Sequence, residues 1–275
     1  MTSSTTSATE RAAEFRRLHQ DGVLVLPNAW DAASAALVEQ AGARAVATTS
    51  GGVAWSLGAP DGDGVSRDLV VDAVRRIAAA VAVPVSADIV SGFGATPDEV
   101  GETIRLVIEA GAVGVNIEDG GAPLRPVAEQ AERVAAARAA ADASGVPLFL
   151  NVRTDVYLRG VGAEADRPAE VLRRAAAYVA AGADGIFVPG LRDPEVLREL
   201  AAGIPRPLNV LAGPGAPAVA ELAGLGVRRV SVGTALALTA YGTARRAAAA
   251  MLATGTYEAL TGGIDYGELD GLFGG

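Results

Sequence analysis

Short apolar runs alternate with longer amphipathic stretches along most of the chain. Runs of this kind occur at residues 23–26, 44–49, 84–89, 113–117, 148–152, 185–188, 208–211 and 229–232. They are rich in Val, Ile, Leu and Ala without strict alternation, which is typical of parallel strands covered on both faces. A segment with helical spacing follows each run, and many of these segments end at glycine. Eight strand–helix units predict an α/β fold, a (β/α)8 TIM barrel.

The two ends of the chain are read as additions to one barrel domain spanning residues 1–275. Residues 1–7 are polar and are expected to be disordered, and residues 8–20 are expected to form a helix before the first strand. Residues 255–275 form a glycine-rich extension that carries Tyr257, Leu260 and Ile264, so it is expected to pack on another subunit. A doubly wound open sheet is the competing fold, but no G-x-G-x-x-G follows the first strand.

The composition removes several kinds of chemistry. The sequence has no cysteine and no lysine, and His19 is its one histidine. Thiolate nucleophiles, Cys-ligated zinc and Schiff bases are therefore excluded, and a Ser-His-Asp triad or a histidine-based class II aldolase is disfavoured. We expect His19 to be a solvated residue in the last turn of the first helix. Carboxylates, arginines, hydroxyls, backbone amides and a hard metal ion remain for catalysis.

The net charge of −9 argues against a nucleic-acid partner, which would need a basic face. No uncharged apolar run is long enough to cross a membrane, and no membrane partner is expected. The sequence therefore predicts a soluble, cytoplasmic protein whose partners are a small molecule and further copies of itself.

Carboxylates stand where two neighbouring predicted strands end. Asp88 closes the run at 84–89, and Glu118 and Asp119 follow the run at 113–117. Arg153 follows the next strand. Because the active sites of such barrels lie at the carboxyl ends of the strands, these side chains are expected to meet. Asp88 and Glu118 suit Mg²⁺ or Mn²⁺, and Arg153 suits a substrate carboxylate.

Some roles at these strand ends stay open. Side chains alternate along a strand, so Glu118 is assigned to the barrel interior and Asp119 to the loop, with or without a chemical role. Asp155 either pairs with Arg153 or caps the next turn. The exposed amides of Gly51 and Gly52, after Ser50, would donate to the substrate carboxylate or to an enolate oxygen.

Several segments together resemble the isocitrate lyase/phosphoenolpyruvate mutase superfamily, from about residue 26 to residue 260. They are Pro27-Asn28-Ala29-Trp30-Asp31, Thr49-Ser50-Gly51-Gly52, Leu57-Gly58-Ala59-Pro60-Asp61, Ala87-Asp88-Ile89-Val90-Ser91-Gly92-Phe93-Gly94, Asn116-Ile117-Glu118-Asp119, Asn151-Val152-Arg153-Thr154-Asp155 and Gly185-Ile186-Phe187-Val188-Pro189-Gly190.

The resemblance implies a Mg²⁺-dependent enzyme that acts on 2-oxo acids through an enolate, often as a tetramer that exchanges C-terminal helices. It implies that Asp88 binds the metal directly and that Asp61 and Glu118 hold its waters. The implied substrate pocket consists of Trp30, Ser50, Gly51, Gly52, Asn151 and Arg153, with Ser50, Asp61 and Arg153 also catalytic.

The chain departs from the superfamily pattern at three places. Val90 stands where a second acid is usual, the cysteine motif of isocitrate and methylisocitrate lyases is absent, and the segment 120–125 lacks the lysine and Asn-Ser of mutases and phosphonopyruvate hydrolases. We therefore predict a Mg²⁺-dependent lyase or decarboxylase that cleaves a C–C bond beside a 2-oxo acid through a metal-stabilised enolate. The alternatives are a phosphonate C–P mutase or hydrolase and a degenerate member that binds a small carboxylate.

Overall fold

The computed structural model describes residues 7–62 and 64–274. Its strands form one parallel sheet in the order β1-β9-β8-β7-β6-β5-β4-β3-β2. The predicted disorder of residues 1–7 falls outside the described residues except at Ser7, which caps the first helix. The strands are β1 (Leu24–Leu26), β2 (Asn28–Ala29), β3 (Val46–Thr48), β4 (Val85–Asp88), β5 (Gly114–Glu118), β6 (Phe149–Arg153), β7 (Gly185–Val188), β8 (Leu208–Leu211) and β9 (Arg229–Ser231).

The strand predicted at residues 23–26 is β1, and a second short strand that was not predicted, β2, follows it after Pro27. β1 pairs with β9 and β2 pairs with β3, so one continuous stretch of chain joins the two edges of the sheet. Proline has no N–H to donate, but the Pro27 carbonyl accepts a hydrogen bond from the Ala47 amide at 3.1 Å. The predicted (β/α)8 barrel is confirmed, with β2 as an additional short strand.

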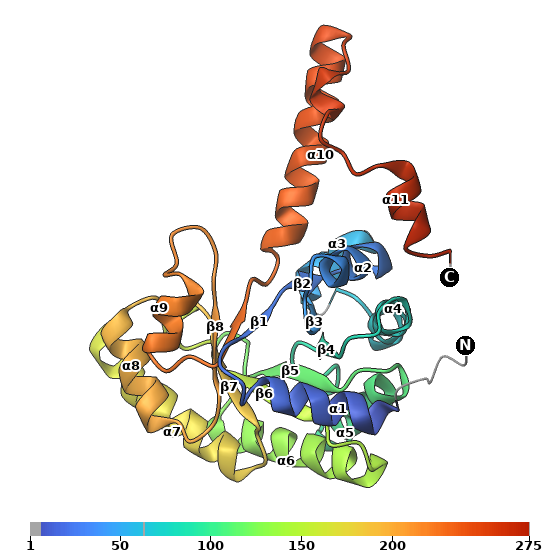
Figure 1. Cartoon of the computed structure of the whole chain (residues 1–275). Helices are drawn as coiled ribbons and strands as arrows, with labels where there is room; N and C mark the ends of the chain where they lie inside the picture. Colours follow the sequence, from blue (N-terminus) through green and yellow to red (C-terminus); the bar gives the residue numbers. More distant parts are fainter. Residues whose placement is uncertain (1–6, 63, 275) are drawn as a thin grey trace.

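Helices cover the outside of the barrel over most of its circumference (Figure 1). Their starts follow from local sequence: Thr96 and Glu99, for example, form a capping box before the helix that begins at Pro97. The helices are α1 (Ala8–Leu18), α2 (Ala32–Gln40), α3 (Ser50–Ser56), α4 (Arg67–Ala80), α5 (Pro97–Glu109), α6 (Val127–Ser144), α7 (Arg167–Ala180), α8 (Pro194–Gly203), α9 (Val219–Gly224), α10 (Ala235–Thr254) and α11 (Tyr266–Gly271), with short 3₁₀ turns η1 (Glu164–Asp166) and η2 (Glu258–Leu260).

Helix α1 closes the end of the barrel at which the strands begin, here called the floor. Phe15 packs there in one cluster with Leu24, Val113 and Phe149. The expectation that His19 is solvated is wrong. It is 3% exposed, its ring stacks on Phe149 with centroids 3.9 Å apart, and its Nδ1 lies 2.8 Å from the Phe15 carbonyl oxygen. The last turn of α1 packs against the floor, so His19, which follows that turn, is buried.

The segment after β3 is helical, although a loop with exposed amides was predicted there. Ser50 begins α3, and Gly51 and Gly52 are buried in its first turn. A Cβ on Gly52 would lie 2.8 Å from the Trp30 Cβ and 2.7 Å from the Thr49 Cγ2. The glycine pair therefore allows close packing of the helix start against Trp30 and Thr49, which follow β2 and β3.

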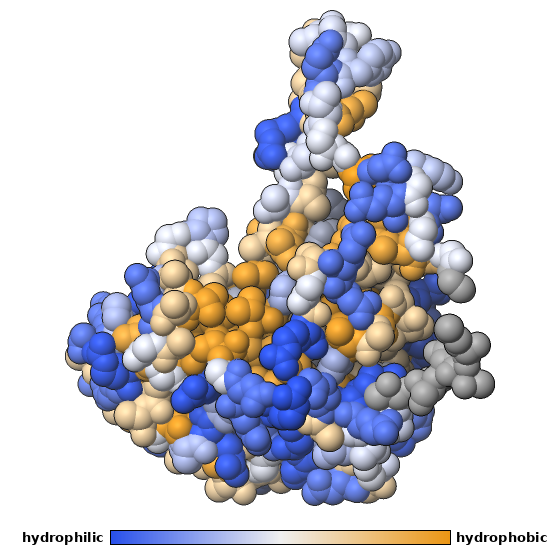
Figure 2. Space-filling view, viewed as in Figure 1, coloured by the Kyte–Doolittle hydropathy of each residue, from blue (hydrophilic) through white to orange (hydrophobic). Residues whose placement is uncertain are grey.

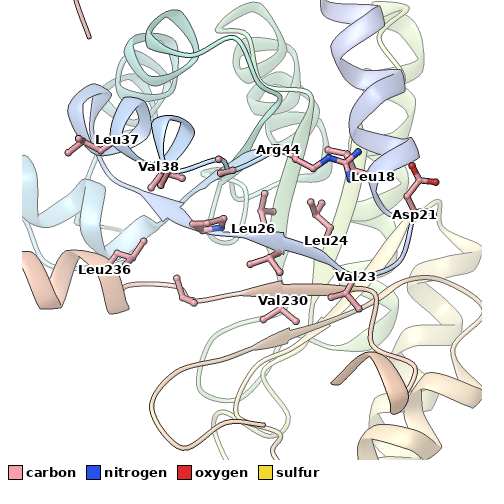
Figure 3. A pocket seen from close by; sticks show the side chains of 16 residues that line it. Leu18, Asp21, Val23, Leu24, Leu26, Leu37, Val38, Arg44, Val230 and Leu236 are labelled. Carbon is pink, nitrogen blue, oxygen red and sulfur yellow. The ribbon is translucent and has the colours of Figure 1, made fainter. Parts of the chain in front are cut away.

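Helix α10 leaves the barrel instead of packing on it (Figure 1). Beneath its base, the outer face of β1 and β9 is hydrophobic surface without a covering helix (Figure 2). A groove of about 670 Å³ lies there, and Figure 3 shows Leu24, Leu37, Val38 and Val230 around it. The terminal extension returns as η2 and α11, where Gln40 donates to Glu268 at 3.2 Å. Within residues 7–62 and 64–274, no helix has the length and hydropathy that a membrane crossing requires.

Candidate active site

Glu118 and Arg153 meet at the end where the strands finish, here called the mouth. They are register partners on β5 and β6, and Arg153 Nη1 lies 2.8 Å from Glu118 Oε2. Asp155 holds the same guanidinium through Nε at 2.6 Å and Nη2 at 3.1 Å. Two hydrogen bonds to Asp155 and an ion pair with Glu118 therefore fix the Arg153 guanidinium at the mouth. Of the two roles left open for Asp155, the structure shows pairing with Arg153.

Asp88 ends β4 beside this pair. The backbone amides of Ser50 and Val90 donate to its two carboxylate oxygens, each at 3.2 Å, and its own amide donates to Thr48 Oγ1 at 2.8 Å. The two amide hydrogen bonds hold the Asp88 carboxylate in place, although 3.2 Å is long for a charge-assisted hydrogen bond. The side chain is half-buried, so its oxygens remain available to a further ligand.

Like charges crowd around Glu118. Burial is the main cause that raises the pKa of this carboxyl, Arg153 lowers it, and the charges of Asp88, Asp155 and Asp61 raise it, so that the pKa is about 7. The side chain is 13% exposed. The structure therefore brings Asp61, Asp88, Glu118 and Arg153 into one electrostatic unit, as the strand-end argument and the resemblance together predicted.

Asp61 reaches the site from the loop after α3. A Cβ on Gly51 would lie 3.1 Å from Asp61 Oδ2 and 2.8 Å from the Thr234 Cγ2. Asp61 itself is exposed, and its Oδ1 accepts from the Gly62 amide at 2.9 Å. Strand position alone gave no reason to place Asp61 here, and only the family resemblance pointed to it.

Trp30 lies at the edge of the same mouth. Its ring centroid is 6.1 Å from that of Tyr241 on α10, and Trp55 on α3 lies 6.4 Å from Tyr241. Ser50 is half-buried beside Asp88 through its backbone amide. Both residues are therefore at the mouth, where the substrate pocket was predicted.

Asn151, in contrast, lies one layer below the mouth. It is 1% exposed, and its Nδ2 donates to Asn116 Oδ1 at 2.8 Å and to Asn209 Oδ1 at 2.9 Å. Because it precedes Arg153 by two residues on β6, it shares the same face at a deeper level. In this structure it ties the strands together inside the barrel and does not face the mouth.

Two buried residues form hydrogen bonds that support the mouth, and the sequence did not predict this role for either. Asp119, left open above, is fully buried and accepts from Tyr178 Oη at 2.7 Å, Arg174 Nη1 at 2.8 Å and the Asp155 amide at 3.0 Å. Asn28 Oδ1 accepts from the Val232 and Gly233 amides at 2.9 and 2.8 Å. Their partners are remote in sequence, so spacing gave no signal for either.

The site fits a hydrated divalent cation better than a fully protein-ligated one. The described part of the chain holds no group of three or more His, Cys, Asp or Glu placed to bind a metal ion together. Mg²⁺ needs only one or two carboxylates and keeps several waters. Asp88 supplies one half-buried carboxylate, and a divalent cation would offset the repulsion that raises the pKa of Glu118. Asp88 would hold the ion, with Glu118 and Asp61 on its waters.

A family model described as phosphoenolpyruvate phosphomutase matches residues 15–252. The chain belongs to the isocitrate lyase/phosphoenolpyruvate mutase superfamily. It is an enzyme of this superfamily, whose members are Mg²⁺-dependent lyases and mutases that act on oxo acids.

Individual relatives span most of the chain. An uncharacterized protein of Mycobacterium tuberculosis is 39% identical over 80% of this chain and 81% of its own length. The 2-methylisocitrate lyase of Escherichia coli strain K12 is 33% identical over 70% of this chain and 66% of its own. Among solved structures, a Burkholderia cenocepacia protein provisionally named a lyase/mutase is 39% identical, with a TM-score of 0.91 and 98% of each chain covered.

One further solved structure bears on the metal. A phosphonopyruvate hydrolase, solved with oxalate and Mg²⁺, is 26% identical, with a TM-score of 0.84 over 96% of this chain and 95% of that one. Mg²⁺ is the metal that the resemblance implied for this chain.

Proposed function

We propose that this protein is a Mg²⁺-dependent lyase or decarboxylase that cleaves a C–C bond next to a 2-oxo acid, of the oxaloacetate-decarboxylase kind. The observation that carries the proposal is the junction of Asp88, Glu118 and Arg153 at one mouth. Such a junction offers an anion-binding fork beside a carboxylate suited to a hard cation.

Each residue at the mouth has a defined task in this proposal. Arg153 binds the substrate carboxylate, while Asp155 keeps the guanidinium in place. Mg²⁺, when bound at Asp88, would polarise the 2-oxo carbonyl and offset the charge that develops on its oxygen. In oxaloacetate the C3–C4 bond breaks, its electron pair forms the enolate of pyruvate, and carbon dioxide leaves. Glu118, with a pKa of about 7, can hold the proton that C3 then takes up.

Oxaloacetate-dependent pyruvate formation tests this proposal. We expect turnover that stops on chelation of the metal and is lost in Asp88→Ala. Arg159→Met is the matched control, because Arg159 contacts Asp155 from the outer side and its side chain is 44% exposed. Unchanged turnover in Asp88→Ala would contradict the proposal.

A C–P mutase or hydrolase is the second candidate, and the likeness to phosphonopyruvate hydrolase favours it. Phosphonopyruvate turnover without oxaloacetate turnover would select it. The segment 120–125 has no lysine, and Arg125 there already pairs with Glu129 at 2.9 Å. A degenerate carboxylate binder would show oxalate binding with neither activity.

We also propose a homo-oligomer, a dimer or tetramer, in which α10 of a second copy covers the groove on β1 and β9. The groove is apolar and lacks an outer helix, while α10 carries exposed Leu238 and Leu252 beyond the groove. Light scattering should give a multiple of the 27.6 kDa chain mass. Val25→Glu, in the groove, should reduce that mass, whereas Val219→Glu, on α9, should not. A monomeric wild type would contradict this proposal.

A further inference from the structure

Arg229 is a charged side chain enclosed inside the barrel. It begins β9, is 1% exposed, and its guanidinium carbon lies 5.8 Å from the centre of the Phe15 ring. Nη2 donates to Asn116 Oδ1 at 3.1 Å and to Ser86 Oγ at 3.4 Å. Nε and Nη1 have no hydrogen-bond partner among the described residues. A guanidinium this deeply buried is costly unless an anion offsets its charge.

The partners of Arg229 place its charge directly beneath the mouth. Ser86 precedes Asp88 by two residues on β4, so both point into the barrel, one layer apart. Asn116 stands in the same relation to Glu118 on β5. The guanidinium of Arg229 therefore lies inside the barrel, one layer of side chains below Asp88 and Glu118.

Asp88 is the carboxylate that acts on this buried cation. Burial lowers the pKa of Arg229 to about 9, and the charge of Asp88 opposes that change. The rise along a strand sets Asp88 about 7 Å beyond Ser86, a range at which charges interact appreciably in a protein interior. Arg229 is therefore a cation at neutral pH and acts on the place where a divalent cation would bind.

We propose that Arg229 is a positioning residue that, through Asp88, opposes the binding of a divalent cation alone and so couples metal binding to the binding of an anionic substrate. The inference rests on the proposed function, because it needs a metal site at Asp88. Mg²⁺ alone brings two positive charges towards Arg229, whereas Mg²⁺ with a dicarboxylate brings no net charge. The repulsion therefore acts on the free metal and is relieved in the ternary complex.

Calorimetric titration of Mg²⁺, with and without saturating oxalate, measures this coupling in the full-length protein. In Arg229→Met we expect Mg²⁺ alone to bind roughly tenfold tighter than in wild type, because a like charge is removed. Mg²⁺ affinity at saturating oxalate should change by less than about threefold. The coupling factor, which is the ratio of the Mg²⁺ affinity with oxalate to that without it, therefore falls in the variant.

Two further measurements keep the proposal falsifiable. Thermal unfolding followed by circular dichroism verifies that each variant is folded. Arg229→Gln is neutral and can still donate to Asn116 Oδ1, so it replaces Arg229→Met if the latter does not fold. The proposal is overturned if the folded neutral variants bind Mg²⁺ alone no tighter than wild type.

Failure of this inference is distinguishable from failure of the proposed function. If wild type binds Mg²⁺ neither alone nor with oxalate, the metal site itself is wrong and both proposals fall. If wild type shows coupled binding but the neutral variants keep the same coupling factor, only the role of Arg229 is wrong.

Discussion

The mouth and the floor of this barrel enclose opposite charges. At the mouth, burial and the charges of Asp88, Asp155 and Asp61 outweigh the effect of Arg153 and raise the pKa of Glu118 to about 7. At the floor, burial and then the charge of Arg229 lower the pKa of His19 to about 3. The barrel thus carries several carboxylates where the strands end and the buried guanidinium of Arg229 nearer to where they begin. The difference supports the proposed cation site at the mouth, and at the floor burial keeps the histidine neutral.

The largest expected effect comes from removing the one cation that the mouth carboxylates share. Arg153→Met leaves Glu118 and Asp155 without their buried partner, so the free energy of unfolding should fall by about 3–5 kcal/mol. Oxalate binding should also be lost. Urea unfolding measures the first effect and calorimetry the second. Arg159→Met, which removes a more exposed partner of Asp155, should cost less than about 1 kcal/mol, and an equal loss in both variants would contradict the account.

The floor should make the protein sensitive to acid. The folded-state pKa of His19 lies below its unfolded value, so the unfolded chain binds the proton more readily. Stability is then fully present above pH 6.5 and is lost as the pH falls toward 3, by about 3 kcal/mol near pH 4. His19→Gln should flatten that part of a plot of unfolding free energy against pH. A wild-type curve with the same slope as the variant would show that His19 is not enclosed.

The mouth should respond in the opposite direction. The folded-state pKa of Glu118 lies above its unfolded value of 4.5, so metal-free stability should decrease as the pH rises from about 4.5 to 7. The integrated effect is about 2–3 kcal/mol. Glu118→Gln should abolish this decrease, and Mg²⁺ with oxalate should weaken it in wild type. The comparison is made with chelator present. If the free energy of unfolding of wild type rose between pH 4.5 and 7 relative to that of Glu118→Gln, a raised pKa of Glu118 would be refuted.

The smallest effect concerns backbone strain, which the described residues place at the mouth. Val90 and Phe93 both have φ of 51° in the segment after Asp88. A β-branched residue in this left-handed region is strained, whereas asparagine tolerates it. Val90→Asn should therefore raise the free energy of unfolding by about 1 kcal/mol. Val90→Ile keeps the branching and should bring no gain, and equal stabilities for the two variants would count against strain at this position.

The sequence-based predictions succeeded where local pattern decides the structure. The apolar runs predicted the strands, and alternation along residues 113–118 predicted that Glu118 points inward. They failed where a distant segment decides. His19 is enclosed because α1 packs on Phe149, and Asn151 is drawn into a layer with Asn116 and Asn209.

The same limit applies to the support of the site. The burial of Asp119 depends on Arg174 and Tyr178, which come from a helix more than fifty residues further on. Arg229 is buried because β9 lies in the barrel wall with its side chain directed at Ser86 and Asn116 on β4 and β5. Neither is set by spacing in the sequence, so a pattern of residues cannot predict them.

Calorimetric titration of oxalate into wild type and Asp88→Ala, each with and without Mg²⁺, tests the central claim most directly. If Asp88, Glu118 and Arg153 form one metal-assisted site for a 2-oxo acid, oxalate binds wild type only with Mg²⁺ and does not bind Asp88→Ala under either condition. Equal oxalate binding with and without Mg²⁺, or undiminished binding to Asp88→Ala in its presence, would contradict that claim.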